Sequence, residues 1–166
     1  MKLPVYILKF ILLSACAGCL SSCMGKVPVD VVTDGKDLFF LLEKPAEIEL
    51  VKVRLAKTQR GKPPKVFWLL GHDPASPVKS RKYPELGQIR YGRKYEGFTR
   101  VEGPFPLQKN TEYLVEINMP GKFAGEIFVI TDGNTVLMPR PAFERQKKRE
   151  YEISADKNGD KVFKAK

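Results

Sequence analysis

The chain has 166 residues, of which 43% are hydrophobic and 29% are charged, and its formal net charge is +10. This length and apolar content are enough for one domain with a single core, and they exclude a globally disordered chain. The charge stays basic when Lys2 and Lys9 of the N-terminal segment are left out, so we expect anionic partners or a surface charged for solubility.

Residues 1–22 have the layout of a secretory signal. Lysines precede a short apolar run that begins at Phe10, and small residues follow before Cys23. The run is too short to span a bilayer, which takes about 20 apolar residues. Beyond such a signal the available anions are lipid head groups, cell-wall polymers and acidic proteins, so we expect no nucleic-acid partner.

All three cysteines, Cys16, Cys19 and Cys23, lie at the end of this segment. None occurs later, which disfavours a disulfide framework, and the single histidine, His72, disfavours a zinc site. The cluster resembles the bacterial lipobox, in which a leucine, two small residues and a cysteine are read by the lipoprotein signal peptidase. LSSC at Cys23 and LSAC at Cys16 both fit. Cys23 is favoured because it leaves the longer apolar region, and Cys16 stays an alternative.

The lipobox resemblance implies that residues 1–22 are removed and that Cys23 carries diacylglycerol and an amide-linked acyl chain. Several chains, at about 0.8 kcal/mol per buried CH₂, make an effectively permanent anchor in the lipid bilayer. Residues 23–26 then form a short lipidated tether. Met24 stands where inner-membrane lipoproteins typically carry aspartate. We therefore expect a lipid-anchored protein of the bacterial cell envelope, in the outer membrane and facing the periplasm.

From residue 27 onward the chain has the periodicity of β-strands. Residues 113–119 alternate apolar and polar positions, as residues 48–55 do, which is typical of half-buried strands. Pairs typical of two-residue hairpin turns stand at Asp34-Gly35, Asp132-Gly133 and Asn158-Gly159. The expected strands are 27–33, 37–42, 48–55, 64–70, 113–119, 124–130, 135–138, 151–155 and 161–165.

This pattern predicts an all-β fold. We expect an antiparallel Ig-like or transthyretin-like β-sandwich over residues 27–138. Residues 139–166 form a basic connector and an additional C-terminal hairpin. Two stretches do not have a strand pattern: 71–86 is a long Pro-rich loop, and 140–149 holds a short helix or a ribbon.

Candidate catalytic and metal-binding residues are few. His72-Asp73 is the one place where an imidazole adjoins a carboxylate, but nothing in the sequence brings a nucleophile to it, and Asp before Pro is an ordinary turn former. Residues 156–160 (DKNGD) superficially resemble a calcium loop but lack its length and its terminal glutamate. We therefore expect a protein that is not an enzyme and that uses no cofactor or metal.

Residues 79–100 combine basic and aromatic residues with few acidic ones. Tyrosine and arginine carry many binding hot spots, and long loops are common recognition surfaces. The alternative is a solvated loop whose tyrosines cover one end of the sandwich. The expected partner-binding residues are Arg90, Tyr91, Arg93 and Tyr95, and a protein partner is expected to be acidic.

Several stretches resemble small bacterial envelope lipoproteins: VDVVTDGKDLFFLL, ELVKVRLAK followed by VFWLL, and PFPLQKNTEYLVEI. The pattern is similar to that of type VI secretion immunity lipoproteins and covers residues 27–131. It implies a periplasm-facing binding protein that captures a partner protein, a secreted toxin in an immunity role. Alternatives are a structural envelope lipoprotein that contacts peptidoglycan or anionic lipid, and an accessory lipoprotein of a secretion apparatus, because fold alone does not separate these functions.

Overall fold

The computed structural model describes residues 25–58 and 61–166, so the signal segment, Cys16 and Cys23 lie outside the described residues. Strands and two short 3₁₀ helices, η1 (Val78–Ser80) and η2 (Glu144–Lys148), make up the regular structure. In chain order the strands are β1 (Gly25–Val27), β2 (Val29–Thr33), β3 (Leu38–Glu47), β4 (Leu50–Leu55), β5 (Val66–Gly71), β6 (Glu85–Arg90), β7 (Arg100–Glu102), β8 (Glu112–Met119), β9 (Lys122–Ile130), β10 (Val136–Leu137), β11 (Tyr151–Ala155) and β12 (Lys161–Ala165).

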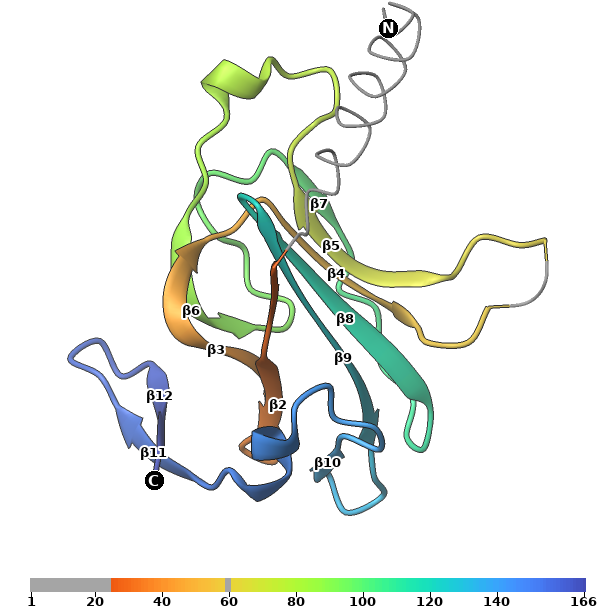
Figure 1. Cartoon of the computed structure of the whole chain (residues 1–166), viewed down its shortest axis with the longest axis vertical. Coiled ribbons are helices and arrows are strands. Elements are labelled where there is room, and N and C mark those ends of the chain that lie inside the picture. Colours follow the sequence, from red (N-terminus) through yellow and green to blue (C-terminus); the bar gives the residue numbers. More distant parts are fainter. Residues whose placement is uncertain (1–24, 59–60) are drawn as a thin grey trace, which may run out of the picture.

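The strands form two facing sheets and a separate C-terminal hairpin (Figure 1). The large sheet has the order β1-β9-β8-β4-β5-β7, with β10 also on β9, and the small sheet has the order β2-β3-β6. All pairs are antiparallel except β1 with β9. The predicted all-β, antiparallel architecture is confirmed, as is the hairpin of β11 and β12. The Ig-like or transthyretin-like subtype stays a prediction.

The core lies between the two sheets, and the alternation of apolar and polar residues in β4 and β8 turns one face of each strand toward it. Along β8, Tyr113, Val115 and Ile117 are fully buried. Phe40 of the small sheet bridges the layers, since its ring centroid lies 6.4 Å from that of Trp68 and 5.9 Å from that of Phe128. These contacts make one continuous apolar core between the sheets.

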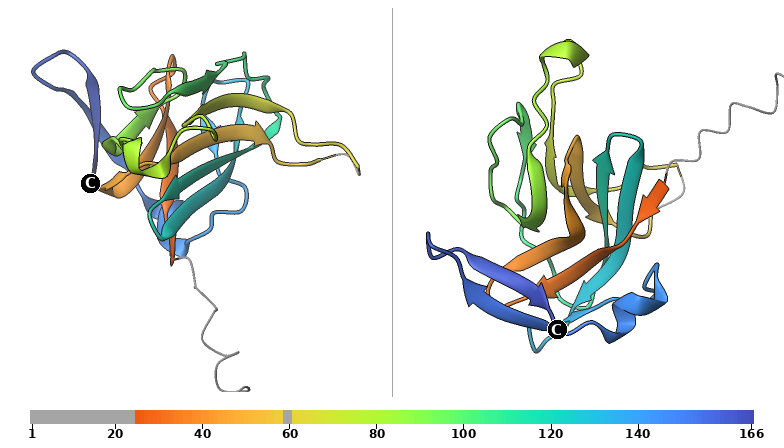
Figure 2. Two further views of the ribbon diagram at one scale, coloured as in Figure 1. Left: turned by 90° about the horizontal axis from the view of Figure 1, so that it is seen from above. Right: turned by 60° about the vertical axis from the view of Figure 1, so that its left-hand side comes forward.

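Residues 29–31 of β2 and 38–41 of β3 are buried on both faces, unlike the half-buried strand β8 of the large sheet. Phe39 and Leu41 point away from the core and are still only 2% and 6% exposed. The hairpin of β11 and β12 covers this outer face, with the ring of Phe163 4.8 Å from that of Phe39. Figure 2 shows the hairpin lying beside the small sheet as a further layer. The continuous apolar run 38–42 is explained by this double burial.

The structure differs from the sequence prediction mainly between residues 71 and 102. The predicted loop 71–86 ends earlier, because β6 begins at Glu85, and β7 adds an edge strand to the large sheet. Strand β6 has no apolar alternation; its pairing with β3 makes it a strand. The basic connector holds η2, so the short-helix alternative is confirmed as a 3₁₀ turn.

Candidate functional site

The four predicted binding residues lie at the end of β6 and in the turn that follows it. Arg90, Arg93 and Tyr95 line one groove of about 360 Å³ between the outer face of the small sheet and the tip of the C-terminal hairpin. Tyr91 does not line this groove and packs instead against the core. The structure therefore brings three of the four residues together. The other groove residues are Asp37, Phe39, Leu86, Gln88, Gly159, Asp160 and Lys161.

Both arginines of the groove are paired with carboxylates from other elements. Arg90 lies 3.0 Å from Asp37, which follows the β2–β3 turn, and Arg93 lies 3.0 Å from Asp160 in the hairpin. The hydrogen bond from Arg93 to Asp160 raises the pKa of this guanidinium, against the opposing effect of burial. Since the pairs are partly exposed, their Coulomb energy is screened and modest. These ion pairs therefore add little to the stability of the fold.

The two tyrosines use their hydroxyl groups within the fold. The Tyr91 hydroxyl donates to the Phe105 carbonyl at 2.7 Å. Burial raises the pKa of Tyr91. Its ring packs edge-on against Trp68, with centroids 5.2 Å apart. The Tyr95 hydroxyl accepts the backbone N–H of Arg90 at 2.8 Å. Partner binding by these tyrosines stays a prediction, and Tyr91 has a structural role in addition.

The C-terminal hairpin forms one wall of the groove and is held there by side chains of β6 and the β2–β3 turn. Gln88 donates to the Lys161 carbonyl at 2.5 Å and accepts the backbone N–H of Phe163 at 3.2 Å, so a single side chain satisfies two backbone groups of β12. Lys161 also forms an ion pair with Asp34. The sequence predicts the hairpin but gives no sign that it completes this site.

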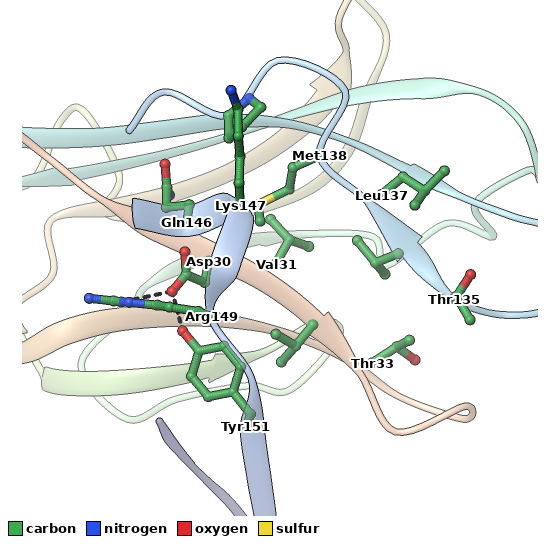
Figure 3. A pocket seen from close by; sticks show the side chains of 13 residues that line it. Asp30, Val31, Thr33, Thr135, Leu137, Met138, Gln146, Lys147, Arg149 and Tyr151 are labelled. Atoms are coloured by element: carbon green, nitrogen blue, oxygen red, sulfur yellow. Dashed lines mark hydrogen bonds and ion pairs between the residues drawn. The ribbon is translucent and has the colours of Figure 1, made fainter. Parts of the chain in front are cut away.

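A second, larger pocket of about 490 Å³ lies between β2, β10 and the basic connector (Figure 3). At its wall the Asp30 carboxylate, 1% exposed, pairs with Arg149 at 2.8 Å and accepts the Tyr151 hydroxyl. Burial, with the Asp30 hydrogen bond, raises the pKa of Tyr151 to about 12. A buried carboxylate is costly unless it is paired, so this cluster fixes the connector on β2.

Glu126 holds the same connector from the other sheet. It lies on the inward face of β9, is 2% exposed, and accepts the backbone N–H groups of Ala142 at 2.8 Å and Ile127 at 3.0 Å. Burial raises its pKa, and the nearby charge of Asp30 adds to this shift. Sequence reasoning missed both acids, although each stands in an otherwise apolar strand. Their contacts show that they clamp the connector to both sheets.

His72 and Asp73 are not paired with each other. The Asp73 carboxylate accepts the backbone N–H of Ala75 at 2.9 Å, and the His72 ring packs edge-on against Tyr83 with centroids 5.2 Å apart. Burial, followed by the charge of Arg81, lowers the pKa of His72. Within residues 25–58 and 61–166, no group of three or more His, Cys, Asp or Glu side chains is placed to hold a metal ion.

Comparison with known proteins finds no relative of this chain: no protein-family model, curated protein or solved structure matches it. In the part of the chain that the structure describes, no helix has the length and apolar character needed to cross a bilayer.

Proposed function

We propose that the protein is a lipid-anchored binding protein of the cell envelope, which captures a partner protein on its periplasmic side. The partner is an acidic protein, and toxin immunity is the role suggested by the sequence resemblance. The observation that carries the proposal is the convergence of Arg90, Arg93 and Tyr95 on one groove. This groove combines exposed guanidinium groups with aromatic rings, the chemistry that carries most binding hot spots.

The geometry of the groove suits exchange of ion-pair partners. Arg93 is held between the Asp160 carboxylate at 3.0 Å and the Tyr95 ring, whose centroid is 5.5 Å from the guanidinium. A carboxylate of the partner replaces Asp160 at the guanidinium without loss of the cation–π contact. Charge of this kind accelerates encounter with an acidic protein, so association should slow as salt rises.

The test is binding of purified candidate partners, beginning with the products of adjacent genes, to wild type and to the Arg90→Ala/Arg93→Ala variant. Loss of true anchors should weaken binding by at least about 2 kcal/mol. Arg100→Ala is the matched control, because Arg100 is equally exposed and equally paired, with Glu102, but lies on β7 outside the groove. Its loss should cost less than about 1 kcal/mol. Equal binding by all three proteins contradicts the proposed site.

A structural role in the envelope is the second candidate, and one feature favours it. Residues 56–65 contain no acidic residue, and those of them that the structure describes, 56–58 and 61–65, project from the sandwich beyond β4 and β5 (Figure 1). Lys57 in this segment is 84% exposed. Such an arm fits a polyanion such as peptidoglycan. If wild type binds no protein but sediments with purified sacculi, and Lys57→Glu/Lys62→Glu does not, this role replaces partner capture.

A further inference from the structure

The tether fixes which end of the domain lies nearest the membrane. Only Met24 separates Cys23 from Gly25, a contour of two peptide units or about 7 Å. The backbone N–H of Gly25 donates to the Gly121 carbonyl at 3.3 Å, and β1 pairs with the first residues of β9. The chain is therefore held at the β8–β9 turn from its first described residue. An anchor at Cys23 brings this end of the sandwich close to the lipid surface.

The same end of the molecule carries the Pro-rich loop with η1. In Figures 1 and 2 this loop extends beyond the strands on the side where β1 begins, whereas β10 and the connector lie at the opposite end. Val78 in η1 is 66% exposed, the highest value among the exposed large hydrophobic side chains of the described residues. A single exposed apolar residue is common on protein surfaces, so the place of Val78 at the lipid-proximal end and the charges beside it carry the argument.

The loop is organised to present Val78. The Arg81 guanidinium lies inside the loop and donates to the Ser76 carbonyl at 2.8 Å and to the Pro74 carbonyl at 3.3 Å. The Ser80 hydroxyl donates to the Pro77 carbonyl at 2.8 Å. These bonds fix the turn around Val78, so less conformational entropy is lost when its tip meets a surface.

The charges beside Val78 match an anionic lipid surface. Lys79 and Lys82 are exposed, and neither forms an ion pair in the described part of the chain. Lys122, next to the tether, is also exposed and without an ion pair among the described residues. A long lysine side chain can keep its ammonium at the head groups while its methylenes follow an inserted apolar neighbour. Each such lysine strengthens partitioning to an anionic surface by about fivefold.

From this geometry we infer that the η1 loop is a second membrane contact: Val78 inserts at the interface and Lys79 and Lys82 bind anionic phospholipid head groups. The inference rests on the proposed anchor at Cys23. Together the acyl chains and the loop fix the orientation of the domain, with the groove of Arg90 and Arg93 turned to the side. The bilayer is thus a partner of the folded domain as well as of its lipid.

The experiment uses the full lipidated protein in vesicles of phosphatidylethanolamine and phosphatidylglycerol with brominated acyl chains, which quench nearby tryptophan. The sole native tryptophan, Trp68, is 0% exposed and gives the baseline in wild type. The added emission in Val78→Trp should be quenched. Leu137→Trp, at a 57% exposed aliphatic position on β10, is the matched control and should stay unquenched. Adding Lys79→Glu/Lys82→Glu to Val78→Trp should remove most of the quenching, and Lys57→Glu/Lys62→Glu should not.

The outcomes separate the two proposals. Flotation with the vesicles but no quenching in Val78→Trp, or equal quenching in Leu137→Trp, overturns the loop contact and leaves the anchor intact. Failure to float overturns both. Equal quenching in vesicles of phosphatidylcholine alone contradicts the role of the lysines. An unchanged far-ultraviolet circular dichroism spectrum in detergent shows that each variant is folded.

Discussion

Tyr91 is a structural residue as well as a predicted binding residue. Its ring packs on Trp68 and its hydroxyl donates to the Phe105 carbonyl. Tyr91→Ala should therefore lower the free energy of unfolding by about 2–3 kcal/mol, and Tyr91→Phe by about 1 kcal/mol. Denaturant unfolding followed by Trp68 fluorescence measures both. Phe105→Ala, which removes a 52% exposed ring and keeps the backbone carbonyl, is the control and should have little effect. Unchanged stability in Tyr91→Ala would sink this assignment.

Composition located the segment of the candidate site but not the direction of its side chains. The sequence between residues 79 and 100 shows the mixture of arginine and tyrosine, which is a local property. Whether Tyr91 faces the core or Arg93 faces the hairpin depends on where β6 pairs with β3, which is a long-range property. Asp30 and Glu126 were missed for the same reason, because their partners, Arg149 and Ala142, come from a distant part of the chain.

At the scale of elements, the docked hairpin should respond to acid through Asp34. Burial alone would raise the pKa of Asp34, but hydrogen bonds from the Asp37 backbone N–H and the Lys161 ammonium lower it to about 2. Because the folded pKa lies below the unfolded value of 3.8, Asp34 stabilises the fold above about pH 4. This contribution is lost as pH falls from about 4 through 2.

The measurement is the free energy of unfolding of wild type and Asp34→Asn between pH 7 and pH 2. The difference between them should be largest at neutral pH and should shrink as the solution is acidified. A constant difference across this range means that the ionisation of Asp34 does not stabilise the fold.

Phe163 should hold the hairpin on the small sheet. An isolated two-stranded hairpin is marginally stable in water, so its docking depends on the contact between Phe163 and Phe39. Phe163→Ala should make the hairpin, residues 151–166, susceptible to limited proteolysis, while the emission of Trp68 stays that of a folded core. Glu152→Ala, at an exposed position on β11 whose side chain lies on the opposite face of the hairpin from Phe163, should stay resistant. Equal resistance of both variants contradicts this role of Phe163.

The sequence predicted elements well where their signal is local. The positions of the hairpins at Asp34-Gly35 and Asn158-Gly159 were predicted from the Asx-Gly pairs, and Gly35 and Gly159 adopt positive φ, at 89° and 79°, which residues with a Cβ rarely adopt. The two-residue turn length was wrong, because the connections span residues 34–37 and 156–160. Strands β6 and β7 were missed because they are edge strands, defined by hydrogen bonds to β3 and β5 rather than by apolar alternation. Docking of the C-terminal hairpin on the small sheet was not predicted. Phe39 and Leu41 place apolar side chains on the outer face of that sheet, and another element has to bury them.

At the scale of the whole molecule, stability should not depend on redox conditions. The last cysteine of the chain is Cys23, so residues 25–166 contain no thiol. We expect the denaturant midpoint to be the same with and without reductant, measured by Trp68 fluorescence. A shift in the midpoint would mean that the cysteines at the N-terminus cross-link molecules or contact the fold.

The export and lipidation of the chain should depend on a single cysteine. Cys23 lies outside the described residues, and its lipobox is a sequence prediction whose physical consequence is an anchor of several acyl chains. Labelled palmitate supplied to cells should mark the protein, and Cys23→Ser should abolish the label and release or stall the precursor. Cys16→Ser and Cys19→Ser are the matched controls, and both should keep the label.

If Cys23→Ser stays labelled and only Cys16→Ser loses the label, the anchor moves to Cys16. The tether then lengthens to about 30 Å and no longer holds the η1 loop at the bilayer.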